Sequence, residues 1–161
     1  MEPKKIILCP NPDRDTGMKA TKSAIAILRD MGFQTVVCSP FRDPKTDAFG
    51  DLPSKPLLPE LKGADLVITL GGDGTILHVA VTLRDHPIPI IGVNFGGKGF
   101  LAGLEDDELD MLLEIADGQY TVSRRMMLDV ELVRNERIIC TQAVLNDVVI
   151  HGGHVDCIVV T

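Results

Sequence analysis

The chain has 161 residues, of which 45% are apolar and 24% charged, and its formal net charge is −7. This length allows one ordinary hydrophobic core, or one domain and part of another. The acidic excess argues against a nucleic-acid partner, and no apolar run approaches the roughly 20 residues that cross a membrane. Residue 4 already begins a predicted strand, so no secretory leader is expected and we predict a cytoplasmic protein. We expect reduced, mostly buried thiols rather than a zinc site at Cys9, Cys38, Cys140 and Cys157.

The first forty residues predict a βαβ unit. Residues 4–9 form a short apolar run typical of a strand, and residues 18–31 carry apolar side chains at helical spacing. Gly32 is a plausible end for that helix. Residues 33–39 predict a second strand, and a strand-helix-strand order implies a parallel sheet with a right-handed crossover.

Residues 40–59 contain five prolines. Because proline lacks a backbone N–H, this segment predicts a long surface loop with neither a helix nor a central strand. Two interpretations stay open for it. The loop is either a tolerated insertion or a lid over the functional site.

The most informative stretch is a strand that runs into a loop of three glycines. Residues 66–70 are apolar and β-branched, residues 71–75 read Gly-Gly-Asp-Gly-Thr, and a helix is predicted from Thr75. Such a turn gathers backbone N–H groups and the positive end of a helix where a phosphate can bind. A carboxylate repels phosphates unless it holds a cation, takes a proton or binds a hydroxyl. Asp73 therefore indicates phosphoryl transfer, although it could instead cap the helix of a tight turn.

A second glycine-rich loop follows the next predicted strand, residues 88–93. Residues 94–101 read Asn-Phe-Gly-Gly-Lys-Gly-Phe-Leu. Since ligands of open α/β sheets bind at the carboxyl ends of strands, we expect both loops to face one crevice. Residues 97–102 also fit the looser Gly-x-Gly-x-x-Ala dinucleotide pattern, or only a turn that needs positive φ. The acids at 106–108 predict a capped helix start rather than metal ligands.

From Tyr120 onward the pattern alternates as in antiparallel strands. Strands are predicted at 128–133 and 137–141, joined by a turn at Asn135 and Glu136, with further strands at 144–150 and 155–160. We therefore predict a Rossmann-like α/β domain with a parallel sheet at 1–122 and the beginning of an all-β domain at 123–161. Because the chain stops within an apolar strand, we expect the second domain to be incomplete.

Three motifs resemble those of one enzyme family. Gly-Gly-Asp-Gly-Thr at residues 71–75 is shared by NAD kinases, diacylglycerol kinases and sphingosine kinases, with a close relative in phosphofructokinases. Residues 92–101 resemble the Gly-x-Asn-x-Gly-x-x-Gly-Phe-Leu segment of NAD kinases. Residues 145–151 resemble their Asn-Glu/Asp motif, and residues 125–128 resemble the entry to their β domain. With all three in the family's order, the chain resembles bacterial-type NAD kinases.

The resemblance implies phosphorylation of the 2′-hydroxyl of the adenosine ribose of NAD, by ATP or another phosphate donor, to give NADP. Asp73 would take or position the proton of that hydroxyl, and Phe100 would pack against the adenine. Asn146 and Asp147 would bind the other ribose. His78 would contact a phosphate, or is only a half-buried helix histidine. The implied binding residues, none of them a metal ligand, are Gly71, Gly72, Asp73, Gly74, Thr75, His78, Asn94, Phe100, Asn146 and Asp147.

The resemblance further implies Mg²⁺ or another divalent cation bound with ATP, and a homo-oligomer, either a dimer or a tetramer. Asp147 is one methylene shorter than the glutamate of many relatives, Lys98 replaces a common leucine, and Cys157 receives no role. The family's remaining site segments would follow Thr161, so we expect little activity from these 161 residues alone. Two alternatives stay open, a diacylglycerol-type lipid kinase and a non-catalytic nucleotide-binding fragment.

Overall fold

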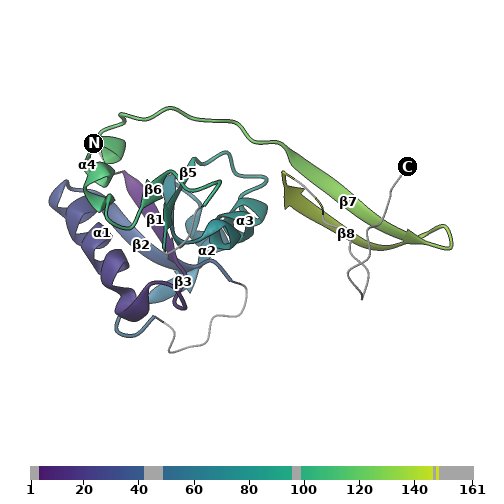
Figure 1. The fold of residues 1–161 in the computed structure, drawn as a ribbon, viewed down its shortest axis with the longest axis horizontal. Helices are drawn as coiled ribbons and strands as arrows, with labels where there is room; N and C mark the ends of the chain where they lie inside the picture. Colours follow the sequence, from purple (N-terminus) through teal and green to yellow (C-terminus); the bar gives the residue numbers. More distant parts are fainter. Residues whose placement is uncertain (1–3, 42–48, 96–98, 147, 149–161) are drawn as a thin grey trace. The chain divides into compact units, whose positions relative to one another are not determined.

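The structure is a computed structural model that describes residues 4–41, 49–95, 99–146 and 148. The chain divides into two compact units, residues 1–123 and 124–161, beside the boundary predicted at 122. The elements of the first unit are shown in Figure 1. They are β1 (Lys5–Pro10), η1 (Thr16–Met18), α1 (Lys19–Asp30), β2 (Gln34–Ser39), β3 (Ser54–Pro56), α2 (Leu57–Glu60), β4 (Ala64–Gly71), α3 (Asp73–Thr82), β5 (Ile90–Asn94), β6 (Leu104–Glu105), η2 (Leu109–Met111) and α4 (Leu112–Ala116).

The first unit is built on a parallel sheet, which confirms the predicted α/β class. Its strand order is β3-β2-β1-β4-β5-β6, and every neighbouring pair is parallel. The chain adds strands outward from β1 on one side and then crosses to β4 on the other, so the order reverses between β1 and β4. Ligands of such sheets bind outside the carboxyl ends of the strands at this reversal.

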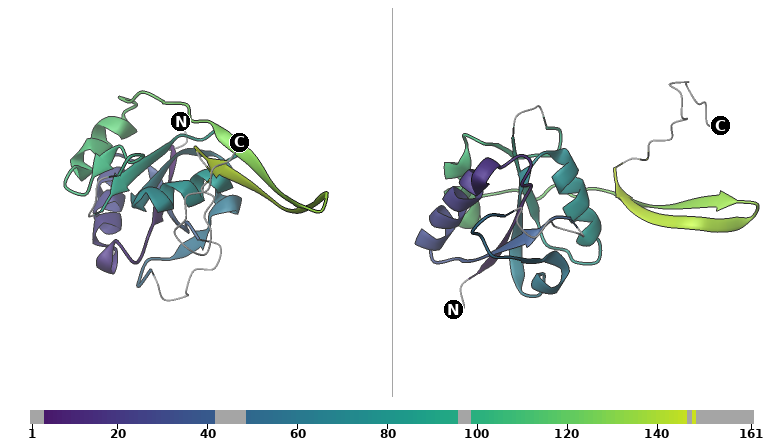
Figure 2. Two further views of the ribbon diagram at one scale, coloured as in Figure 1. Left: turned by 45° about the vertical axis from the view of Figure 1, so that its right-hand side comes forward. Right: turned by 90° about the horizontal axis from the view of Figure 1, so that it is seen from below.

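Both faces of the sheet are covered, which explains the continuous apolar runs of its strands. Ile6 and Leu8 of β1 pack in one core with α1 and α4, whereas Ile7 and Cys9 pack in another with α2 and α3. This division follows the two-residue alternation of a strand. The right-hand view of Figure 2 shows α1 and α3 on opposite sides of the sheet.

The proline-rich segment differs from its prediction. Residues 54–60 form the edge strand β3 and the single helical turn α2, so the expectation of a loop without a helix was wrong here. Pro56 is tolerated because β3 pairs only with β2. Pro59 is tolerated because it lies in the first turn, where a backbone N–H has no helical partner. Residues 42–48 lie outside the described residues, so the choice between insertion and lid stays open.

The second unit contains an antiparallel hairpin of β7 (Met127–Arg134) and β8 (Arg137–Leu145). Asn135 and Glu136 have φ values of 50° and 61°, as a two-residue type I′ turn requires. The sequence predicted separate strands at 137–141 and 144–150. Instead β8 runs unbroken to Leu145, and the strand predicted at 155–160 lies outside the described residues. No helix in the part of the chain that the structure describes is long and apolar enough to cross a membrane.

Candidate active site

The two glycine-rich loops begin side by side at the carboxyl edge of the sheet. Gly71 ends β4, Asn94 ends β5, and the two residues are register partners. The backbone N–H of Phe95 donates to the carbonyl oxygen of Gly71 at 2.8 Å. The first loop also lies at the reversal of strand order, because it follows β4. The two loops therefore begin next to each other, as the sequence predicted, and a ligand crevice between them stays a prediction.

Asp73 joins the two loops through its side chain. Its Oδ2 accepts the N–H of Phe100 at 2.8 Å and its Oδ1 accepts the N–H of Leu101 at 3.2 Å. Asp73 is the first residue of α3, whose N-cap is Gly72, and no side chain caps this helix. The alternative role of Asp73 as a helix cap is therefore wrong. A carboxylate offers about four lone-pair positions, so acceptor capacity remains for a hydroxyl.

The three glycines of the first loop are used in different ways. A Cβ on Gly71 would lie 2.5 Å from Thr75 Oγ1 and 3.0 Å from Asn11 Cβ, so this position excludes any side chain. A Cβ on Gly72 or Gly74 would meet nothing within 4 Å. The structure thus leaves open space beside these two residues. Thr75 is buried beneath the loop at 2% exposure.

Asn11 belongs to this site and was missed in the sequence. It follows β1, on the other side of the reversal, and its backbone N–H donates to the carbonyl oxygen of Leu70 at 2.7 Å. Its Nδ2 lies 3.5 Å from Thr75 Oγ1, and its Oδ1 accepts the N–H of Asp13. An asparagine directly after the first strand of a doubly wound sheet was the available signal.

Asn94 and Phe100 lie in the same region but are exposed to very different degrees. Asn94 is 3% exposed, and its Nδ2 donates to Glu105 Oε2 at 3.0 Å. Phe100 is 88% exposed, so its ring is accessible while its N–H is held by Asp73. Glu105 is a second residue that the sequence did not indicate.

His78 lies on a different side of α3 from Asp73. Five residues at 3.6 per turn place the two side chains roughly 140° apart around the helix. The His78 ring makes an edge-to-face contact with Phe41, with the ring centroids 5.2 Å apart and the planes at 76°. Ser39 holds Phe41 in place, since its Oγ donates to the Phe41 carbonyl and accepts the Phe41 N–H. The His78 side chain therefore lies away from the Asp73 carboxylate.

Asn146 lies in the second unit, where it follows β8. It is exposed, has a φ of 70°, and its N–H donates to the carbonyl oxygen of Met126 at 3.3 Å. Asp147, Lys98 and Cys157 lie outside the described residues. The predicted roles of Asn146 and Asp147 therefore stay predictions.

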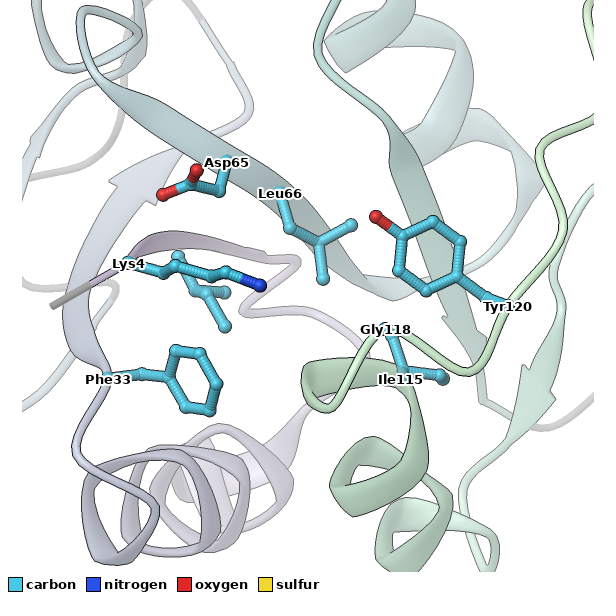
Figure 3. Close-up of a pocket in the computed structure, with 8 residues that line it drawn as sticks. Lys4, Phe33, Asp65, Leu66, Ile115, Gly118 and Tyr120 are labelled. Atoms are coloured by element: carbon cyan, nitrogen blue, oxygen red, sulfur yellow. The ribbon is translucent and has the colours of Figure 1, made fainter. Parts of the chain in front are cut away.

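A separate hollow of about 130 Å³ lies at the amino ends of β1 and β4. Figure 3 shows Lys4 extending between Leu66 and Phe33, with Tyr120 on another side. Asp65, also in its wall, accepts the backbone N–H of Lys5 at 2.8 Å. Small-molecule pockets typically measure about 300–1,000 Å³, so this hollow is too small for a nucleotide.

Burial makes the Cys9 thiol a poor nucleophile. Cys9 precedes the last residue of β1, and burial, followed by the neighbouring Cys38, raises its pKa. Cys38 is also buried, whereas Cys140 is exposed on β8, so the expected burial holds for two of the three described thiols. Within the described ranges no group of three or more His, Cys, Asp or Glu side chains could hold a metal ion.

The chain resembles known proteins over most of its length. Residues 6–120 match the family model of the ATP-NAD kinase N-terminal domain. An NAD kinase of Acetivibrio thermocellus is 33% identical over 150 residues, which cover 92% of this chain and 51% of that protein. An NAD kinase of Syntrophobacter fumaroxidans is 46% identical over 108 residues, which cover 66% of this chain and 38% of that protein. The chain thus spans about half or less of these curated relatives.

Two solved structures share the fold. Yeast NADH kinase complexed with NADH superposes with a TM-score of 0.66 at 20% identity, covering 89% of this chain and 47% of that one. An NAD kinase from Archaeoglobus fulgidus in complex with ATP gives a TM-score of 0.54 at 19% identity, covering 83% of this chain and 45% of that one. At these identities the likeness concerns the fold alone.

Proposed function

The chain belongs to the NAD kinase family through its ATP-NAD kinase N-terminal domain, and from that premise we propose that the protein phosphorylates NAD to NADP with ATP as donor. The observation that carries the proposal is the Asp73 carboxylate, held between two glycine-rich loops at the reversal of strand order. The named relatives favour NAD over diacylglycerol as the acceptor.

In this proposal Asp73 is the general base. Its carboxylate accepts a hydrogen bond from the 2′-hydroxyl of the adenosine ribose and takes the proton as the hydroxyl oxygen attacks the γ-phosphorus of ATP. The bond from that phosphorus to the β-phosphate oxygen breaks, and ADP leaves. The two amide hydrogen bonds fix the plane of the carboxylate while leaving acceptor positions for the hydroxyl. Base catalysis of this kind contributes about 10²–10⁴-fold to rate.

The start of α3 supports nucleotide binding in the same region. Open space beside Gly72 and Gly74 lets a ligand approach the backbone closely, and the helix end favours negative charge. The exposed ring of Phe100 offers a surface for the adenine. We assign Asn146 and Asp147 to the hydroxyls of the other ribose. His78 reaches a phosphate only if the ligand extends around α3 toward Phe41.

A divalent cation fits this site as a companion of ATP. Mg²⁺ commonly keeps several waters and binds through substrate phosphates and one or two carboxylates, so it needs no cluster of protein ligands. The cation would neutralise charge on the triphosphate, as phosphoryl transfer generally requires. The cytoplasmic location and the dimer or tetramer stay predictions.

The proposal is tested with protein expressed from its complete reading frame. NADP formed from NAD and ATP is measured by coupling to an NADP-specific dehydrogenase, with dispersed diacylglycerol as the competing acceptor. We expect NADP to form only when NAD, ATP and a divalent cation are all present. Absence of NADP together with phosphorylation of diacylglycerol would overturn the proposal.

A further inference from the structure

The second glycine-rich loop is fastened to the first loop at two points. Phe95 donates its N–H to the Gly71 carbonyl at the beginning of the loop, and Phe100 and Leu101 donate theirs to Asp73 near its end. The orientation of the Asp73 carboxylate therefore depends on where the loop backbone lies. Whatever holds the loop in place also holds the carboxylate.

Gly99 has little room for a side chain beside Asp73 and Asn94. A Cβ at this glycine would lie 3.0 Å from Asp73 Oδ1 and 3.4 Å from Asn94 Cγ. The buried carboxamide of Asn94 therefore lies beside the loop backbone at Gly99. A shift or rotation of that carboxamide would move Gly99 and the two N–H groups that follow it.

Glu105 fixes the carboxamide of Asn94. The two residues are register partners in β5 and β6, and Asn94 Nδ2 donates to Glu105 Oε2 at 3.0 Å. Glu105 is itself anchored, because its backbone N–H donates to Glu108 Oε2 at 3.0 Å. A hydrogen bond thus joins Glu105 to Asn94, and Asn94 lies beside Gly99. The N–H groups of the next two residues, Phe100 and Leu101, bind the carboxylate of Asp73.

We propose that Glu105 is a positioning residue, which acts through Asn94 and Gly99 to orient the carboxylate of Asp73. Its effect on turnover rests on the proposed kinase function, whereas its effect on the loop does not. Removing the carboxylate of Glu105, which is an exposed residue, deletes the hydrogen bond that Asn94 Nδ2 donates to it, and a hydrogen bond to a charged group contributes more to stability than one between neutral groups. The carboxamide then reorients, and the amides on Asp73 are held less firmly.

Hydrogen exchange of the ¹⁵N-labelled chain tests the positioning role directly. In Glu105→Ala we expect the amides of Phe100 and Leu101 to exchange roughly 3- to 10-fold faster, as the loss of about one hydrogen bond would give. The amide of Ile68, in the core of β4, should exchange as in the wild type. Glu105→Gln keeps a side-chain oxygen that can accept from Asn94, and it should restore slow exchange.

The matched control is Asp107→Ala, which removes a neighbouring acid that makes no contact with Asn94. It should leave both loop amides unchanged. Unchanged exchange in a folded Glu105→Ala variant, or equal acceleration in Asp107→Ala, would overturn the proposal. If Glu105→Ala does not fold, Glu105→Asp replaces it, because the shorter side chain moves the carboxylate away from Asn94. The amides of Phe100 and Leu101 should then exchange faster than in the wild type.

Kinetics of the protein expressed from its complete reading frame provide the second measurement. Glu105→Ala should lower kcat about 10-fold or more while KM for NAD changes by less than about 2-fold, because a misplaced base slows the proton transfer. A rise in KM with unchanged kcat would contradict positioning of the base. If the wild type forms no NADP, the kinase proposal fails, while the exchange result still decides the role of Glu105.

Discussion

Alanine at Gly71 and at Gly74 should have opposite effects on stability, although the two positions lie three residues apart. At Gly71 the new Cβ would lie 2.5 Å from Thr75 Oγ1, which is buried, and 3.0 Å from Asn11 Cβ. Overpacking of this kind costs about 1–3 kcal/mol. At Gly74, in the first turn of α3, a Cβ would meet nothing within 4 Å. Alanine there should stabilise the chain by up to about 1 kcal/mol, because it favours the helix.

The free energy of unfolding of both variants is measured by urea titration of the 161-residue chain. Turnover of the same variants is measured in the protein expressed from its complete reading frame. Gly74→Ala should lose turnover despite its higher stability, since its methyl group enters the space assigned to the nucleotide. A Gly71→Ala variant as stable as the wild type would refute the packing argument. Normal turnover in Gly74→Ala would refute the placement of the nucleotide beside Gly74.

Two further predictions concern titratable groups outside the site. Burial raises the pKa of Cys9 and raises that of Cys38 to about 12, so iodoacetamide at pH 8 should alkylate Cys140 in the native chain and spare both buried thiols. Equal labelling of all three would contradict their burial. Hydrogen bonds from Lys5 and Lys55 lower the pKa of the Glu60 carboxyl from its usual value of 4.5 in the folded chain. The ionised Glu60 carboxylate therefore stabilises the folded chain above pH 4.5, and this stabilisation is lost as the pH falls through the lowered pKa. The urea concentration at the unfolding midpoint is measured at several pH values. Between about pH 5 and about pH 3 this midpoint should fall less steeply in Glu60→Gln than in the wild type.

The parallel sheet could be predicted from the sequence because its signals are local. Buried strands give apolar runs, and Gly32 ends α1 with a φ of +85°. The antiparallel hairpin of the second unit has a local signal too, because the type I′ turn at Asn135 and Glu136 separates two alternating runs. The prediction of a loop over the whole proline-rich segment was wrong, because proline excludes only central strands and helix interiors. An edge strand and a first helical turn satisfy the backbone without the missing N–H.

The meeting of the two loops could be predicted, but the contacts that hold them together could not. The carboxyl ends of neighbouring parallel strands fix the general location. The hydrogen bonds from Phe100 and Leu101 to Asp73 link residues 27 and 28 positions apart, and no spacing rule encodes them. The pairing of Asn94 with Glu105 depends on β6, a two-residue strand too short to leave a pattern.

The kinetics of Asp73→Asn test the central claim most directly. Asparagine keeps the size of the side chain but cannot take a proton at neutral pH, and it keeps one of the two oxygens that accept the loop N–H groups. Hydrogen exchange of the Phe100 and Leu101 amides in the same variant shows how far the loop itself is loosened. If Asp73 is the base, kcat for NADP formation should fall about 10²–10⁴-fold, while KM for NAD changes far less. Asp107→Asn should leave both constants unchanged. An Asp73→Asn enzyme with near-normal kcat would contradict the account.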